Sequence, residues 1–94
     1  MRYIDVNWLH DLEDESYSLV SEIGPDQYET RKLEFFRKGE VGYASSVMHT
    51  KNTMLGIAEV PTIEKINSQD EFQGQNISKK LFEKLWKEHV PKSP

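Results

Sequence analysis

The spacing of apolar residues changes part-way along this chain, and that change restricts the fold more than any other feature. Near the start, Ile4, Val6 and Trp8 alternate with polar residues, which is the period of a half-buried strand. Near the end, Phe82 and Trp86 recur four residues apart, as on one face of a helix. Strands followed by helices are typical of α+β domains. We expect an antiparallel sheet of four to five strands, with a short helix and a C-terminal helix packed on one face.

Strand signals fill residues 1–57. The expected strands are residues 2–9, 17–23, 28–37 and 41–45. Lys38, Gly39 and Glu40 are typical of a hairpin turn, so the third and fourth strands should pair antiparallel. Residues 54–57 could add a short fifth strand at a sheet edge. Residues 69–76 are expected to form a loop.

Helix signals fill residues 62–90. Thr62 can cap a short helix that runs to about Ser68, and Ser78 can cap a longer helix that Pro91 ends. The longer helix should pack on the sheet through its apolar stripe. The aromatic residues expected to form the core there are Trp8, Phe35, Phe36, Phe82 and Trp86. Adjacent Phe35 and Phe36 must point to opposite sheet faces, so one of them should be covered by another element or exposed.

The length of the chain limits it to one core. A chain of 94 residues buries only about 60 to 65% of its unfolded surface, so residues 1–94 should form a single domain, with a frayed tail at 91–94. Cysteine is absent, which excludes disulfides, thiolate metal sites and thiol nucleophiles. No apolar run approaches the roughly 20 residues that span a bilayer, and Asp5 comes too early for a signal peptide. We therefore expect a cytoplasmic protein without membrane contact.

Catalytic residue patterns are not evident. His10, His49 and His89 lack the spacing of metal ligands, and no serine lies in a Gly-x-Ser-x-Gly motif. We expect no enzymatic activity, no metal and no cofactor. His10 should be structural, since it follows Trp8 at the end of a strand. A hydrolase that uses His10 with a neighbouring acid remains a minor alternative.

A calcium loop is a tempting but incomplete match. Asp11, Glu13, Glu15 and Glu22 occupy positions 1, 3, 5 and 12 of such a loop. Position 6, where the sharp turn requires glycine, is Ser16. The residues that follow should form a strand where the motif requires a helix. We therefore predict no calcium site.

Charge is distributed unevenly along the chain. Between Tyr3 and Thr30 there are eight acidic residues and no Lys or Arg, whereas from Val41 onward six acids meet seven lysines. A lobe of negative potential repels nucleic acid and anionic lipid and attracts basic proteins. The charge distribution therefore predicts a protein partner and no nucleic acid.

Several motifs spread over almost the whole chain resemble those of one family. They are Met1-Arg2-Tyr3-Ile4-x-Val6-x-Trp8-Leu9-His10-Asp11, Arg31-Lys32-Leu33-Glu34-x-Phe36, Gly42-Tyr43-Ala44, Leu55-Gly56, Pro61-Thr62-Ile63-Glu64-x-Ile66-Asn67 and Ile77-Ser78-x-x-x-Phe82-Glu83-x-x-Trp86. They resemble a family of small bacterial domains of unknown function, often encoded beside polymorphic toxins and regarded as probable immunity proteins. The resemblance implies binding and neutralisation of a cognate toxin, of the contact-dependent growth inhibition type.

The acidic stretch and the resemblance together predict where a partner binds. Such toxins are often nucleases, which are basic because they grip phosphates, so an acidic surface would steer an inhibitor towards them. The expected toxin-binding residues are Asp11, Glu13, Asp14 and Glu15, followed by Tyr17, Tyr28 and Glu29. The alternative function is a regulatory module without enzymatic activity that docks a peptide on the sheet edge at residues 54–57.

Overall fold

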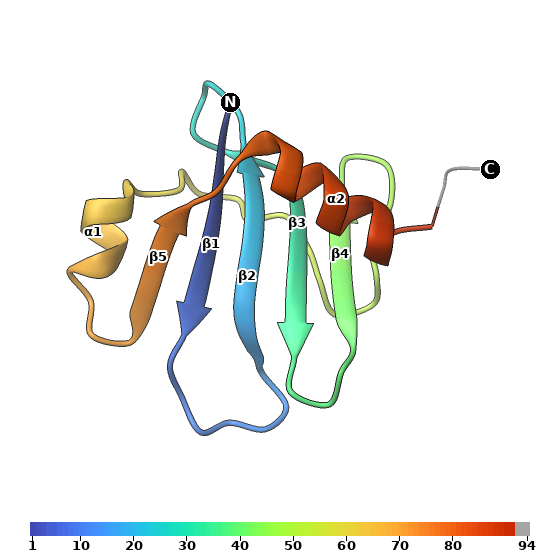
Figure 1. Cartoon of the computed structure of the whole chain (residues 1–94), viewed down its shortest axis with the longest axis horizontal. Helices are drawn as coiled ribbons and strands as arrows, with labels where there is room; N and C mark the ends of the chain where they lie inside the picture. The colour runs from blue at the N-terminus through green and yellow to red at the C-terminus, as the bar shows by residue number, and fades with distance from the viewer. Residues whose placement is uncertain (92–94) are drawn as a thin grey trace.

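The computed structural model of this chain describes residues 1–91, in which five strands and two helices follow one another. The elements are β1 (Arg2–Trp8), β2 (Ser16–Ile23), β3 (Glu29–Phe36), β4 (Val41–Ser45), α1 (Ile63–Asn67), β5 (Phe72–Asn76) and α2 (Lys79–His89). The strands form one antiparallel sheet in the order β4-β3-β2-β1-β5 (Figure 1). The expected α+β class and the pairing of the third and fourth strands are confirmed. Residues 92–94 of the expected frayed tail lie outside the described residues.

Both helices begin where the sequence places a capping residue. The Thr62 hydroxyl accepts a hydrogen bond from the Lys65 amide at 3.2 Å, and the Ser78 hydroxyl accepts one from the Leu81 amide at 3.0 Å. Each bond satisfies an amide that the first helical turn leaves without an intrahelical partner. Within residues 1–91, neither helix has the length and apolar character needed to cross a membrane.

The core has two parts, one on each face of the sheet. Neighbouring residues of a strand point to opposite faces, so Tyr3 and Ile4 belong to different clusters. The cluster beneath α2 contains Tyr3, Val20, Leu33, Phe82 and Val90. The other cluster contains Ile4, Val6, Ile23 and, from α1, Ile66. The fold class therefore holds with a correction in detail, because the helices pack on opposite faces rather than on one.

Phe82 is the only fully buried member of the five aromatic residues expected in the core. Its ring stacks on Trp86, with centroids 6.0 Å apart, and lies 5.3 Å from the ring of Tyr3. The other four rings are half-buried, and of these Phe35 and Trp86 pack against the cluster beneath α2. Aliphatic residues of the central strands, Val20, Ile23 and Leu33, fill the space where the aromatic rings were expected.

The position of the fifth strand differs from the expectation. Residues 54–57 form no strand, whereas Phe72–Asn76, expected to be a loop, forms β5 beside β1. Met54 and Ile57 are exposed, so their apolar character does not reflect burial in the sheet. β5 is held instead by close approach of α1, since a Cβ atom at Gly74 would lie only 3.2 Å from the Ile63 Cδ1 atom. A polar strand of this kind suits a sheet edge, and the alternation rules do not detect it.

Candidate functional site

The loop that joins β1 to β2, residues 9–15, carries the main cluster of predicted contact residues, and we call it the acidic loop. It lies at one end of the sheet, beside the turn between β3 and β4 (Figure 1). Its four carboxylate side chains are all exposed: Asp11, Glu13, Asp14 and Glu15. Asp14 lies 3.7 Å from the Lys38 Nζ atom, in an exposed pair of the kind that contributes little stability. Within residues 1–91, the other three carboxylates form no ion pair.

His10 holds the acidic loop in its conformation through both ring nitrogens. Nε2 lies 2.7 Å from the Ser16 carbonyl oxygen, and Nδ1 accepts a hydrogen bond from the Leu12 amide at 3.0 Å. This pattern requires the neutral ring with its proton on Nε2. The ring also packs edge-to-face on Trp8, with centroids 4.3 Å apart. These backbone contacts agree with the expected structural role, and the hydrogen bonds of both ring nitrogens are to the main chain rather than to the carboxylate that the hydrolase alternative requires.

Two hydrogen bonds of its main chain, one with another main-chain group and one with a side chain, tie the same loop to its surroundings. The Leu9 amide donates to the Glu71 carbonyl at 2.7 Å, just before β5, and Arg37 donates to the His10 carbonyl from the end of β3. The loop is thus anchored on both sides of β1. Its carboxylates project from a backbone that these hydrogen bonds hold in place.

Large apolar side chains stand exposed among these carboxylates, and two of them, Leu9 and Leu12, are not among the predicted contact residues. Leu9, Leu12 and Tyr17 are 48%, 57% and 41% exposed. Leu9 and Tyr17 border a groove that Trp8 and His10 also line. The missed signal was the placement of two leucines inside a run of acids, where neither contributes to a strand pattern.

Tyr28 and Glu29 lie away from the acidic loop, at the opposite end of β2. Tyr28 is exposed in the turn between β2 and β3. The Glu29 carboxylate accepts hydrogen bonds from the Ser21 hydroxyl at 2.9 Å and the Gly56 amide at 2.6 Å, and it pairs with Lys32 at 3.1 Å. Glu29 therefore ties residues 54–57 to the sheet. The structure gathers five of the seven predicted contact residues at one end and separates these two.

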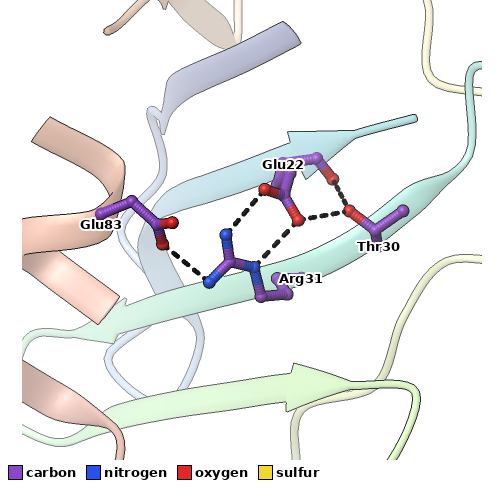
Figure 2. Close-up of polar contacts among 4 residues, drawn as sticks. All are labelled: Glu22, Thr30, Arg31 and Glu83. Atoms are coloured by element: carbon purple, nitrogen blue, oxygen red, sulfur yellow. Dashed lines mark hydrogen bonds and ion pairs between the residues drawn. The ribbon is translucent and has the colours of Figure 1, made fainter. Parts of the chain in front are cut away.

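Glu22 is the acid of the amino-terminal stretch that the fold uses most heavily. Arg31 binds it through Nε at 2.9 Å and Nη2 at 2.7 Å, and Thr30 donates to it at 2.7 Å (Figure 2). Arg31 also reaches Glu83 of α2 at 2.8 Å. The hydrogen bonds from Arg31 outweigh burial and lower the pKa of Glu22 to about 2. The carboxylate of Glu22, the last position of the apparent calcium loop, is thus bound by the guanidinium group of Arg31.

The same arginine connects the sheet to α2. Its guanidinium carbon lies 4.9 Å from the ring centroid of Phe82 and 5.1 Å from that of Trp86, within the range of cation–π attraction. Hydrogen bonding to Glu22 raises the pKa of Arg31. Burial and a hydrogen bond to Glu22 also raise the pKa of the Tyr3 hydroxyl. These contacts form a structural network, which we call the arginine network: Tyr3, Glu22, Thr30, Arg31 and Glu83.

The stretch without cations in the sequence is not a single anionic face in space. Four of its eight acids lie in the acidic loop and one, Glu22, in the arginine network. The other three are Asp5, in a half-buried contact with Ser18, Asp26, in the turn before β3, and Glu29, at the start of β3. β3 and the turn after it bring Arg31 and Lys38 next to acids that have no cation nearby in sequence. The predicted anionic surface is therefore reduced to the acidic loop.

Comparison with known proteins gives a family. The family model described as a domain of unknown function, DUF6881, matches residues 2–91. The chain belongs to this family. The match includes every strand and helix of the DUF6881 fold described above. No curated protein and no solved structure matches the chain. The role at toxin loci that the sequence resemblance implies stays a prediction.

Both outer strands of this DUF6881 sheet are occupied by the chain itself. On β4, Thr50 binds the amide of Tyr43 at 3.1 Å and its carbonyl at 2.9 Å. On β5, the Asn67 side chain binds the amide of Gly74 at 2.6 Å and its carbonyl at 3.0 Å. These are groups that an added strand would use. The expected docking edge at residues 54–57 is also wrong, because that segment is not a strand.

Proposed function

We propose that this chain is an immunity protein that binds a cognate bacterial toxin through the acidic loop and neutralises it. The observation that carries the proposal is the concentration of four exposed carboxylates on one short, anchored loop, with exposed apolar side chains among them. The chain would act in the cytoplasm by binding alone, with no cofactor and no catalytic step. The choice of a toxin as the partner rests on the family resemblance described above.

The chemistry of the loop favours a basic partner. Three carboxylates that form no ion pair within residues 1–91 attract a cationic surface over roughly one Debye length, about 8 Å at physiological salt. The same field repels nucleic acid and anionic membranes. A nuclease toxin meets this requirement, because it carries a cationic groove for phosphates. An acidic loop placed in that groove would exclude the substrate.

Peptide addition to a sheet edge, the second function considered, has weaker support. It requires free main-chain amides and carbonyls on an outer strand. Thr50 and Asn67 occupy such groups on β4 and β5.

Co-expression with the product of the adjoining gene tests the proposal. That product alone should arrest growth, and this chain should restore growth and bind it with a one-to-one stoichiometry. As a control, an unrelated acidic protein of similar net charge should give no protection. If the adjoining product is harmless, or if it remains toxic and unbound in the presence of this chain, the proposed function is wrong.

A further inference from the structure

The apolar residues of the acidic loop form a compact group, unlike most exposed apolar residues of this chain. Val47, Met54 and Ile57 are also exposed, but none of them lines the groove beside the acidic loop. Leu9 and Tyr17, in contrast, border one groove, whose other lining residues are Asn7, Trp8, His10, Asp11 and Arg37. Three residues beyond Leu9, Leu12 is more than half exposed. Apolar and acidic side chains thus share one surface.

Such a surface has the organisation of a protein interface. Protein interfaces commonly have an apolar centre and a polar rim, and a few central residues contribute most of the binding free energy. Here Leu9 and Tyr17 correspond to the centre, and Asp11 and Arg37, which line the same groove, to the rim. Glu13 and Asp14 lie farther along the acidic loop, where they line a separate pocket beside Lys38. Full burial of a leucine side chain contributes about 1.5 to 3 kcal/mol, which exceeds the typical contribution of an exposed ion pair.

Hydrogen bonds within the chain hold this surface in its conformation. The two hydrogen bonds of the His10 ring close residues 10–16 into a fixed loop, and Arg37 holds the His10 carbonyl. Ordering a flexible loop on binding would oppose association, so an ordered loop favours tight binding. The groove is therefore suited to a rigid, complementary partner surface.

We propose that the groove beside the acidic loop receives one apolar side chain of a folded basic protein, and that lysines or arginines around that side chain meet the carboxylates. This inference rests on the proposed function and specifies its partner. Charge complementarity determines the rim of the partner, and the Trp8, Leu9 and Tyr17 side chains determine its centre. A flexible polycation would use the carboxylates and leave the groove empty.

Leu9→Ser tests the groove, with the purified product of the adjoining gene as the probe. The complex of Leu9→Ser with the probe should dissociate about tenfold faster or more than the wild-type complex at both low and high salt, because the lost contact is apolar. Tyr17→Ser provides a second variant, because Tyr17 lines the same groove, and it should change dissociation in the same direction. Val47→Ser, an exposed apolar residue outside the groove, is the matched control and should dissociate like the wild type.

Two outcomes overturn the inference, and they are distinguishable. If the wild type binds the probe and both serine variants dissociate like Val47→Ser, the groove is unused, although the proposed function stands. If the wild type does not bind the probe, both the inference and the proposed function are wrong. Thermal unfolding of each variant confirms that the comparison is made between folded proteins.

Discussion

The arginine network and the acidic loop use the same residue type in opposite ways. In the arginine network, the Glu22 side chain is only 8% exposed and is bound by Arg31 and Thr30 (Figure 2). In the acidic loop, the carboxylates are exposed, and the only ion pair among them within residues 1–91 joins Asp14 to Lys38 at 3.7 Å. Glu22 therefore stabilises the fold, whereas the loop carboxylates are available to a partner. Whether an acidic residue of this stretch is structural or exposed therefore depends on which neighbouring strand brings a cation next to it.

Replacing Arg31 should produce the largest difference between the two regions. Arg31→Leu leaves Glu22 buried without its cation and removes the contact to Glu83, so it should lower the free energy of unfolding by about 3 to 5 kcal/mol. Lys38→Leu, the matched change in the exposed pair with Asp14, should alter it by less than about 0.5 kcal/mol. Urea denaturation measures both. Equal losses would show that the two regions do not differ in the way described.

Low pH should reduce the free energy of unfolding by protonating Glu22 of the arginine network. The pKa of Glu22 is about 2 in the folded state, below its ordinary value of 4.5. Its contribution to stability is therefore fully present above pH 4.5 and is lost as the pH falls towards 2, with a magnitude on the order of 3 kcal/mol.

The measurement is the free energy of unfolding by urea across that pH range. Glu22→Gln is the control, because it cannot ionise and should show a smaller decrease between pH 4.5 and 2. An equally steep decrease in wild type and Glu22→Gln would mean that other groups cause the acid sensitivity.

Replacing His10 should have a smaller and local effect. His10→Ala removes the acceptor for the Leu12 amide and the donor to the Ser16 carbonyl, for a loss of about 1 kcal/mol. Amide hydrogen exchange should accelerate at Leu12, while the amides of the central strands remain protected. His49→Ala, at an exposed histidine, should leave exchange in the acidic loop unchanged. Unaltered exchange at Leu12 in His10→Ala would show that the histidine does not order the loop.

Local sequence signals predicted the elements that are stabilised locally. The hairpin turn after Arg37 and the caps at Thr62 and Ser78 occur where the sequence places them. β5 escaped prediction because its support is not local: α1 packs on Gly74, and Asn67 binds its main chain. Residues 54–57 were misassigned because their apolar character was taken as evidence of a strand.

The candidate site was predictable to the extent that it lies within one loop. Four consecutive contact predictions, at Asp11, Glu13, Asp14 and Glu15, fall on the same exposed segment. Glu29 was assigned to the site because it is close to the acidic stretch in sequence. In the structure, the length of β2 separates it from the acidic loop. The pairing of Glu22 with Arg31 depends on the register of β2 and β3, in which these residues lie opposite each other. The turn at Gly24 and Pro25 could have indicated that register.

The central claim is that the acidic loop is the docking surface of this protein. The most direct test is the salt dependence of the association rate with the purified product of the adjoining gene, measured for wild type and for a variant with Asp11→Asn, Glu13→Gln, Asp14→Asn and Glu15→Gln. A control of equal charge change neutralises four exposed acids elsewhere: Glu59, Glu64, Asp70 and Glu88.

The loop variant should associate about tenfold more slowly at low salt, with a flattened salt dependence, and should unfold at the same temperature as the wild type. The control should retain most of the wild-type rate. If both variants slow association equally, net charge rather than the acidic loop directs binding, and the central claim is contradicted.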